Sequence, residues 1–351
     1  MSNDVLNPQL RQRGRAEVDF MVNMFKGSAG VRKTADAEIN AAVGNVNELP
    51  EDMDARNDVI ERRVSNSRSR RVSALVGEWH ARNHGNVCER AFEDIYPLIQ
   101  DDLKSLDDGP SELFLNPNFE APAYWEGVDY HRTEGGWDGH PYAGYVHAEI
   151  IHRKIVNSSF PGGIFLPRRK IAARAPKDSY DSILDMGCST AHFTQALQET
   201  YPNAKITGVD LSARTLEHAR RVANAHGWDW KLYQRAAEDT GFKNESFDLV
   251  ASYILLHEVP ASAIEAIFAE AFRLLKPGGD MIMSDVTRYA DVDKLTAWKM
   301  DQGAKYGGEP HWRESASADL GAIAKKVGFI DVNAAGDAPR NYPYVIQGRK
   351  P

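Results

Sequence analysis

The sequence predicts an α/β protein with a mostly parallel seven-stranded sheet covered by helices on both faces, preceded by a mainly α-helical N-terminal domain. Three observations predict this class. The 351 residues leave room for about two domains. From Ser182 onward, short apolar runs alternate with stretches of helical periodicity, which is typical of parallel sheets. Before residue 176 the alternation is missing, and the periodicity is mainly helical.

The strands of the C-terminal half are expected where short apolar runs stop at turn or acidic residues. The first run ends at Gly187, and the fourth is apolar enough to lie in the centre of a sheet. The seven predicted strands span residues 182–186, 205–210, 229–235, 247–255, 280–285, 329–335 and 342–348. The last two form a closing strand pair.

Helices are expected between these strands because the sequence carries start and stop signals. Ser212 is a good N-cap, Pro260 suits the beginning of a helix, and Gly328 suits the end of the last one, over residues 315–327. Ligands of such sheets bind beyond the carboxyl ends of the strands. The site is therefore expected after the first, second and fourth strands.

The N-terminal half is predicted to be helical over residues 15–25, 58–83, 90–106 and 144–156. Residues 158–176, rich in proline and basic residues, are interpreted as the connection to the sheet. The predicted boundary near residue 176 separates a cap, dimerisation and substrate-lid domain (1–176) from a catalytic domain (177–351).

Composition excludes several classes of protein. Apolar residues make up 42% of the chain, so a disordered or fibrous protein is not expected. The net charge of −8 argues against a nucleic-acid partner. Two cysteines, Cys88 and Cys188, are too few for a disulfide framework, and no signal peptide or apolar membrane span is recognisable. We therefore expect a cytoplasmic protein without a membrane partner.

The sharpest motif is the first strand-to-helix turn, Leu-Asp-Met-Gly-Cys-Ser-Thr-Ala at 184–191, together with Asp210 at the end of the second strand. Glycine at such a turn lets the backbone approach a ligand, and an acidic residue at the second strand end can accept hydrogen bonds from ribose hydroxyls. The pair indicates a nucleoside-containing cofactor. A dinucleotide-binding fingerprint does not fit, because His192 stands where the third glycine would be.

Four motifs in order resemble those of class I S-adenosylmethionine-dependent methyltransferases, whose fold is Rossmann-like. They are residues 184–191, 207–212 (TGVDLS), 247–260 (FDLVASYILLHEVP) and 274–279 (LLKPGG). The resemblance covers about residues 178–351. It implies transfer of a methyl group from S-adenosyl-L-methionine to an acceptor.

The resemblance also implies roles for individual residues. The methionine end of the cofactor would be held by Asp185 and by the backbone around Gly187, Cys188 and Ser189, and the ribose by Asp210. The adenine would be flanked by Leu211, Ala237 and Glu238.

The chain departs from the family pattern at three positions. The family usually has glycine where this chain has Ser189 and Ala191, and often an acidic residue where this chain has Ala236. Small side chains at 189 and 191 still allow close approach. Glu238 is the possible substitute for the missing acid at 236.

Tyr253 and His257, just after the fourth strand, are the predicted catalytic residues. Methyl transfer from a sulfonium is an in-line displacement, so a base is needed only when the acceptor must lose a proton. Leu256-His257-Glu258 is similar to an element of small-molecule O-methyltransferases in which histidine acts as base. In other relatives that histidine serves packing or the start of a helix, and both alternatives stay open.

The acceptor pocket is expected to draw on the aromatic and histidine-rich residues 119–152. Tyr142, Tyr145 and His147 are the predicted substrate contacts there, with Trp298 from the insert 287–313 as a second wall. A helical core with a dimer contact is an equal alternative to a lid. No metal site is predicted, because His147, Glu149 and His152 match no established helical spacing of metal ligands.

The sequence thus predicts a small-molecule methyltransferase that forms a homodimer, with oxygen favoured as acceptor atom over nitrogen, sulfur or carbon. Two alternatives are a non-catalytic S-adenosylmethionine-binding regulatory or assembly protein and a protein methyltransferase.

Overall fold

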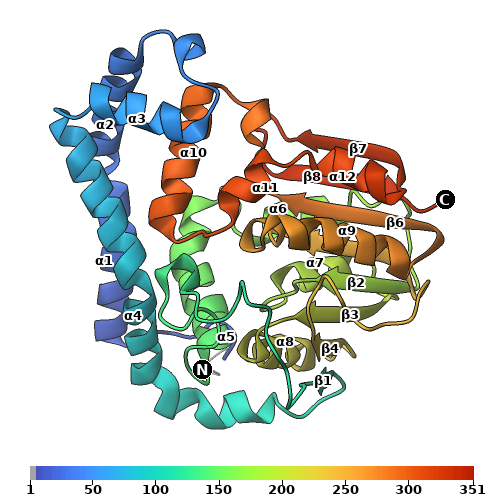
Figure 1. Cartoon of the computed structure of the whole chain (residues 1–351). Helices are drawn as coiled ribbons and strands as arrows, with labels where there is room; N and C mark the ends of the chain where they lie inside the picture. Colours follow the sequence, from blue (N-terminus) through green and yellow to red (C-terminus); the bar gives the residue numbers. More distant parts are fainter. Residues whose placement is uncertain (1–4) are drawn as a thin grey trace.

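The computed structural model describes residues 5–351 and is built around one mixed sheet (Figure 1). Its strand order is β1-β4-β3-β2-β5-β6-β8-β7, and only β8 runs antiparallel to its neighbours. The strands are β1 (Glu112–Phe114), β2 (Ser182–Met186), β3 (Lys205–Asp210), β4 (Lys231–Gln234), β5 (Phe247–Tyr253), β6 (Leu275–Asp285), β7 (Ile330–Gly336) and β8 (Tyr344–Arg349). The predicted fold class and closing strand pair are confirmed.

The sheet has eight strands, and the predicted count of seven is wrong by one. The extra strand, β1, comes from the N-terminal half and pairs in parallel with β4, with Leu113 opposite Leu232. Three residues, of which only the middle one is partly buried, carry too weak a pattern to predict a strand. Pairing with an existing edge supplies the hydrogen bonds that such a segment cannot make alone.

Helices cover both faces of the sheet and bury a core on each (Figure 1). Neighbouring residues of β2 serve opposite faces, because side chains alternate along a strand: Ile183 belongs to the core under α7 and α8, and Leu184 to the core under α9 and α12. The covering helices are α6 (Phe165–Ala172), α7 (His192–Thr200), α8 (Ala213–Ala225), α9 (Ala261–Leu274) and α12 (Leu320–Val327).

The N-terminal helices form a separate layer along the outside of the sheet (Figure 1). They are α1 (Gln12–Gly27), α2 (Ala29–Val43), α3 (Met53–Arg63) and α4 (Arg68–Ser105). The two helices predicted at 58–83 and 90–106 are wrong in their bounds, since α4 is continuous through residues 84–89 and through Pro97. The buried side chains of Val87, Cys88 and Ala91 hold this middle stretch in the core it shares with α1.

The segment after β6 joins the N-terminal layer to the sheet. It contains α10 (Lys294–Gly307) and α11 (Trp312–Ser317). Leu295 and Trp298 of α10 share a core with Ile39 of α2 and Ile60 of α3. The proposed division at residue 176 stays a prediction, although β1 and this core both connect the two parts.

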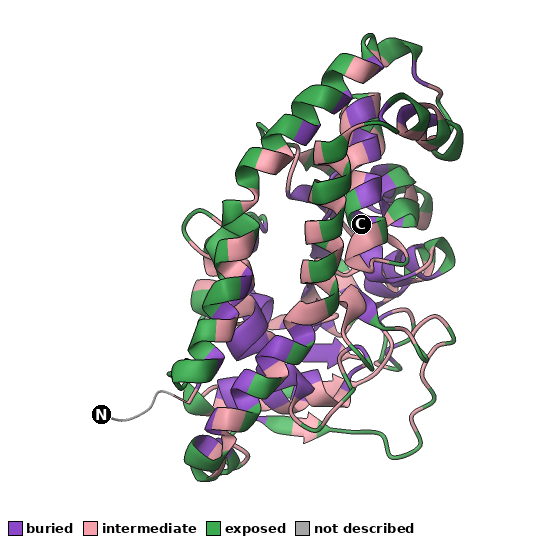
Figure 2. Ribbon diagram, turned by 90° about the vertical axis from the view of Figure 1, so that its left-hand side faces the viewer, coloured by how far each residue is buried: buried purple, intermediate pink, exposed green. Residues whose placement is uncertain are grey.

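Burial divides the N-terminal layer into an inner and an outer face (Figure 2). The outer face of α1 and α4 carries exposed apolar side chains, among them Phe20, Leu75 and Trp79. None of the helices in residues 5–351 combines the length and the apolar character needed to cross a membrane.

Candidate active site

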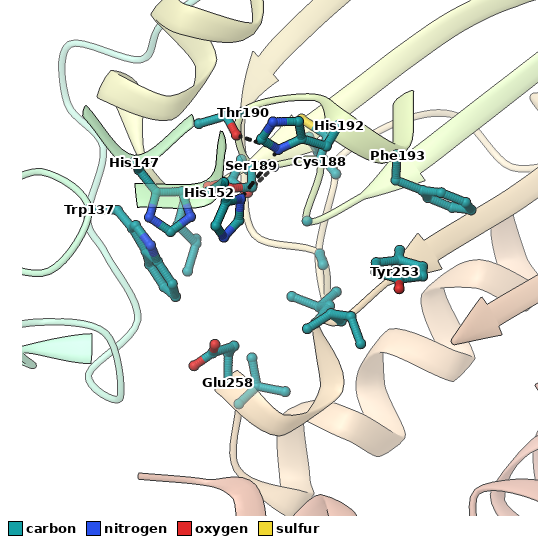
Figure 3. Close-up of a pocket in the computed structure, with 18 of the residues that line it drawn as sticks. Trp137, His147, His152, Cys188, Ser189, Thr190, His192, Phe193, Tyr253 and Glu258 are labelled. Atoms are coloured by element: carbon teal, nitrogen blue, oxygen red, sulfur yellow. Dashed lines mark hydrogen bonds between the residues drawn. The ribbon is translucent and has the colours of Figure 1, made fainter. Parts of the chain in front are cut away.

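A cavity of about 230 Å³ opens at the carboxyl ends of β2, β3 and β5, where the sequence predicted the site (Figure 3). One side consists of strand ends and the turns that follow them, including Gly187, Asp210 and Tyr253. The other side consists of the segment 116–142 and the helical residues 143–172 of the N-terminal half. It contributes the aromatic and basic side chains Tyr124, Trp125, His131, Trp137, His147, His152 and Arg168.

The turn after β2 is built from left-handed backbone. Gly187 has φ +68°, and a Cβ atom there would lie 2.7 Å from Leu255 Cδ1, so glycine is required by conformation and by space. Ser189 and Ala191 also have positive φ, of 47° and 68°. Glycine would adopt these angles without the cost of roughly 1–2 kcal/mol that other residues incur, which agrees with the glycine that the family resemblance implies at both positions.

Asp210 lies at the end of β3 and ties the two strand ends together. Its carboxylate accepts hydrogen bonds from the backbone N–H of Ser189 (2.8 Å) and of Ser212 (2.9 Å). Enclosure by the protein raises the pKa of Asp210 to about 6, against the effect of these hydrogen bonds. The side chain lines the cavity and can still accept hydrogen bonds from a ligand.

Asp185 lies beneath the turn and does not line the cavity. Its side chain is 1% exposed and accepts a hydrogen bond from Thr194 Oγ1 at 2.6 Å, while Oδ1 has no partner among residues 5–351. Burial raises its pKa to about 7. Asp185 is placed to position the turn through α7 rather than to contact a ligand.

Leu211, Ala237 and Glu238 line the cavity, as do Cys188 and Ser189. Glu238 is connected to the opposite wall, because the Tyr124 hydroxyl donates a hydrogen bond to Glu238 Oε1 at 2.7 Å. Glu238 Oε2 is buried and has no partner in the described chain. Of the predicted cofactor-binding residues, only Asp185 lies outside the cavity.

Of the two predicted catalytic residues, Tyr253 faces the cavity and His257 does not. The His257 ring is 2% exposed, with Nδ1 2.8 Å from Asp285 Oδ1 and Nε2 3.3 Å from Glu258 Oε1. Burial opposes protonation, but Asp285 and Glu258 outweigh it and raise the pKa of His257 well above its usual value. Of the two alternatives for His257, its geometry favours a structural histidine, because the ring lies between two carboxylates and does not line the cavity.

Among the predicted substrate contacts, only His147 lines the cavity. Tyr145 is fully buried in the core of the N-terminal helices, and Tyr142 packs against Phe92 with 5.2 Å between the ring centroids. Trp298 is 1% exposed and donates to Asn57 Oδ1 at 3.2 Å. The assignment of these three residues to the substrate is corrected, since large aromatic side chains on helix faces are taken up by the cores between helices.

Three histidines that the sequence did not bring together meet in the cavity. The ring centroids of His147 and His152 lie 4.2 Å apart, and His152 Nδ1 lies 3.4 Å from His192 Nδ1 (Figure 3). Hydrogen bonds in the π-helix η3 (Val146–Ile155) link residues five positions apart. His147 and His152, which are five apart, therefore share one face of this helix. Burial lowers the pKa of all three, that of His147 to about 3, so the rings are neutral.

Glu149 does not join these histidines. It is 1% exposed on the opposite face of η3, where Oε1 lies 3.1 Å from His218 Nε2 and Arg153 binds the other oxygen. The expected α-helical spacing does not place His147 and His152 on one face, whereas the π-helix does. A π-helix is rare and has no reliable sequence signal.

Arg168 of α6 is the second site residue that the sequence did not predict. Its guanidinium carbon lies 4.7 Å from the centroid of the Tyr253 ring, and Nη1 donates to Ile164 O at 2.7 Å. No carboxylate of residues 5–351 forms an ion pair with it, although burial lowers its pKa. A half-buried cation that lines the cavity suits an anionic group of a ligand.

Residues 183–279 match the family model described as a methyltransferase domain. The sheet domain is a class I S-adenosylmethionine-dependent methyltransferase domain. The family resemblance predicted from the sequence motifs is therefore confirmed, and so is S-adenosylmethionine as the cofactor of this domain.

The methyltransferase domain is similar to several curated proteins. It is 31% identical over 120 residues to a ubiquinone/menaquinone biosynthesis C-methyltransferase of Desulfotalea psychrophila, which covers 34% of this chain and 47% of that protein. It is 27% identical over 159 residues to the human arsenite methyltransferase, and this match covers 42% of this chain and 40% of that protein. The chain thus spans less than half the length of these two relatives.

One solved structure is similar over nearly the whole chain. A putative O-methyltransferase from Nostoc punctiforme aligns with a TM-score of 0.50 and 15% identity, covering 94% of this chain and 98% of that one. At this identity the similarity shows the fold alone, including a helical region before the sheet.

The residues of the cavity fit S-adenosylmethionine. Asp210 offers carboxylate oxygens at the second strand end, where a ribose would lie. Arg168 offers a cation without an acidic partner, and Glu238 offers an unpartnered buried oxygen. Each of these groups has a counterpart in the cofactor: ribose hydroxyls, the methionine carboxylate and the adenine amino group.

Proposed function

We propose that this protein transfers a methyl group from S-adenosyl-L-methionine to a small-molecule acceptor, with oxygen favoured over nitrogen, sulfur or carbon as the acceptor atom. One observation carries the proposal: a single cavity connects Asp210 and the β2 turn with an aromatic and histidine-rich wall. Both reactants therefore have residues suited to them within one enclosed space. Enclosure and the net charge of −8 favour a small molecule over a nucleic acid or a protein side chain.

In this proposal the cofactor is held by the strand ends. Asp210 would accept hydrogen bonds from the ribose hydroxyls, and the backbone of Gly187, Cys188 and Ser189 would contact the methionine end. Arg168 would bind the methionine carboxylate, with Tyr253 against the same end. Leu211, Ala237 and Glu238 would surround adenine. When bound, the cofactor supplies a methyl group on a positively charged sulfur.

The acceptor is held by the opposite wall. Trp125 and Trp137 stack with 5.2 Å between ring centroids and give a flat apolar surface. The neutral rings of His147 and His152 can accept hydrogen bonds, which suits an acceptor hydroxyl and supports oxygen as the acceptor atom. Since methyl transfer is an in-line displacement, holding the acceptor atom opposite the methyl group supplies most of the catalysis.

The first test is calorimetry with S-adenosylmethionine. Wild type should bind one equivalent, and Asp210→Ala should bind at least about 100-fold more weakly, because two charge-assisted hydrogen bonds of roughly 1.5–3 kcal/mol each are lost. Asp229→Ala, an exposed aspartate of the same half, is the matched control and should bind as wild type does. Absence of binding by wild type, or an unchanged affinity of Asp210→Ala, would refute the cofactor site.

The acceptor is sought by incubating protein and labelled cofactor with cell extract, followed by mass spectrometry for metabolites that gain one methyl group. Labelled metabolites support the proposal. Tight cofactor binding without any labelled product would favour a non-catalytic binding protein, and label in protein would favour a protein methyltransferase.

We also propose a cytoplasmic homodimer formed through the outer face of α1 and α4. Phe20 (57% exposed), Leu75 (67%) and Trp79 (40%) form an apolar surface that a second copy would cover. Leu75→Glu should convert the dimer to a monomer in light-scattering measurements, while cofactor affinity stays within twofold. A monomeric wild type at micromolar concentration would refute the dimer.

A further inference from the structure

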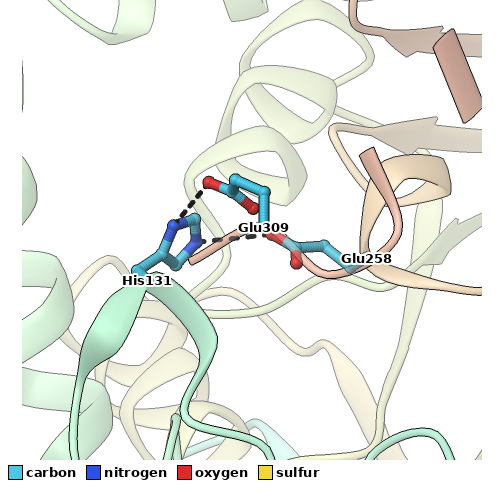
Figure 4. A group of neighbouring side chains, drawn as sticks. All are labelled: His131, Glu258 and Glu309. Atoms are coloured by element: carbon cyan, nitrogen blue, oxygen red, sulfur yellow. Dashed lines mark ion pairs between the residues drawn. The ribbon is translucent and has the colours of Figure 1, made fainter. Parts of the chain in front are cut away.

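One cluster of ionisable side chains at the wall of the cavity is not used by the proposed cofactor site. His131 lies between two glutamates, with Nε2 3.3 Å from Glu258 Oε1 and Nδ1 2.8 Å from Glu309 Oε1 (Figure 4). The three residues come from separate segments: the 3₁₀ turn η2 (Tyr130–Arg132), the 3₁₀ turn η5 (Leu256–Glu258) and the loop that follows α10. His131 and Glu258 line the cavity.

The cluster has an excess of negative charge. Glu258 also contacts His257, which in turn pairs with Asp285, so three carboxylates share two imidazoles. Even with both imidazoles protonated, the five groups carry a net charge of −1. No Lys or Arg side chain in residues 5–351 forms an ion pair with any of these three carboxylates. A further cation would therefore be stabilised here.

Two carboxylate oxygens of the cluster lack partners. Glu258 Oε2 and Glu309 Oε2 are buried and accept no hydrogen bond from residues 5–351, and Glu258 is only 7% exposed. By contrast, both oxygens of Asp285 are used, by the backbone N–H of Leu256 (2.6 Å) and of Val286 (2.8 Å). Buried carboxylate oxygens without a partner are costly, which points to a missing ligand at Glu258 and Glu309 specifically.

We propose that His131, Glu258 and Glu309 bind a divalent transition-metal ion of the Mn²⁺ or Zn²⁺ type. One ligand atom from each residue lies within 4.8 Å of the others, close to the spacing that metal–ligand bonds of about 2.0–2.2 Å require. One imidazole and two carboxylates are a donor set suited to these ions, whereas Mg²⁺ and Ca²⁺ prefer oxygen ligands alone.

The existing contacts show how His131 would serve as ligand. Figure 4 shows both carboxylates directed at its ring. An ion bound by one nitrogen of the His131 ring would replace a proton on that nitrogen. Metal binding at neutral pH should release the proton that the ion replaces.

Two residues that do not contact the ion directly, His257 and Asp285, hold the Glu258 carboxylate in place. His257 Nε2 contacts Glu258 Oε1 at 3.3 Å, and Asp285 holds His257 Nδ1 at 2.8 Å, which fixes the orientation of the Glu258 carboxylate. Such hydrogen-bonded partners behind a ligand are typical of metal sites. His257, which does not line the cavity, thereby acquires a function as a positioning residue.

The consequence for the acceptor rests on the proposed function, whereas metal binding itself does not. Because His131 and Glu258 line the cavity, an ion held by them would lie at the cavity wall. An acceptor with a hydroxyl or carboxylate oxygen could bind such an ion, which would lower the pKa of a bound hydroxyl. The site narrows the acceptor class to oxygen-bearing molecules that coordinate a metal.

The experiment titrates chelator-treated full-length protein with MnCl₂ and, separately, ZnCl₂ by calorimetry at pH 7 in two buffers of different ionisation enthalpy. We expect one ion per chain and release of about one proton. Glu309→Gln should weaken binding at least tenfold, and Glu265→Gln, a surface glutamate paired with Lys326, should bind as wild type does. Bound Mn²⁺ should show ¹⁴N coupling in its electron spin echo spectrum, which His131→Gln abolishes.

Failure to bind either ion, or equal affinity of wild type and Glu309→Gln, overturns the metal site. The cluster would then be an ion-paired histidine, with His131 between Glu258 and Glu309. Circular dichroism melting of each variant separates lost binding from lost fold, and the wild-type titration decides by itself if a variant does not fold. Calorimetry with S-adenosylmethionine on the same preparation keeps the two proposals distinguishable, since cofactor binding without metal binding refutes only the metal site.

Discussion

The two ends of the cavity are built in different ways. The cofactor end consists of turns that follow adjacent parallel strands, and its main side chain, Asp210, is held by backbone N–H groups of Ser189 and Ser212. The acceptor end consists of segments distant in the chain that meet through side chains, such as Trp137 stacked on Tyr130 at 4.8 Å. In the proposed function, backbone geometry would thus position the methyl donor, and side-chain packing would select the acceptor.

The two ends are also connected. Ser212, the N-cap of α8, donates to Asp138 Oδ1 at 2.7 Å, and the same oxygen accepts from the backbone N–H of Arg214 at 3.1 Å. The segment that carries Trp137 is therefore attached to the helix that begins next to Asp210. Substitutions confined to one end should affect one ligand, and the following predictions test that separation in order of decreasing effect.

Arg168→Met should weaken S-adenosylmethionine binding about 10- to 100-fold, because a hydrogen-bonded ion pair with the methionine carboxylate is lost. Calorimetry measures the effect. Arg169→Met, whose guanidinium pairs with Glu199 on the surface, is the matched control on the same helix. An unchanged affinity for the cofactor and a weakened acceptor affinity would instead place Arg168 at the acceptor end.

Cofactor affinity should fall about tenfold per pH unit below pH 6, because Asp210, with its pKa raised to about 6, must be ionised to accept two ribose hydrogen bonds. Folding has the opposite dependence. An aspartate whose pKa is raised on folding destabilises the fold above pH 6, and this cost disappears as the pH falls toward 4. Calorimetry and thermal unfolding between pH 5 and 8 measure both trends.

Asp210→Asn is the control for this pH dependence. Without a titrating group at position 210, the residual cofactor affinity should lose its slope near pH 6. A wild-type affinity that does not change between pH 5 and 8 would contradict the predicted role of Asp210.

Trp137→Ala should lower kcat/KM for the acceptor about two- to tenfold, because one aromatic contact worth about 0.5–1.5 kcal/mol is removed from the stacked wall. Cofactor affinity should change less than twofold. The matched control is Trp79→Ala, an exposed tryptophan on α4. If Trp137→Ala weakened cofactor and acceptor equally, the two ends would not be separable.

Much of the sheet was predictable because parallel strands buried on both faces are almost uniformly apolar, as in residues 182–186 and 247–253. The proposed cofactor residues were predictable for a related reason: Gly187 directly follows β2, and Asp210 ends β3. The eighth strand and the continuous α4 were not predictable, because both depend on partners distant in the sequence.

The acceptor end was predicted only as a region. The aromatic density of residues 119–152 indicated it, but periodicity alone could not decide which rings enter the cavity. Tyr142 and Tyr145 point into the helical core, whereas Trp137 and His147 line the cavity. Arg168 was part of a segment interpreted as a connection, and the π-helix that unites His147 and His152 gives no sequence signal.

The sequence by itself determined the fold class, the methyltransferase domain and its cofactor, because those features reside in short motifs whose local backbone conformation brings the functional groups into place. Only the tertiary structure decided that His257 is enclosed by Asp285 and Glu258, that Arg168 faces the cavity, and that His131 meets Glu258 and Glu309. The physical reason is that a charge depends on its neighbours, and these neighbours come from segments that only the folded chain brings together.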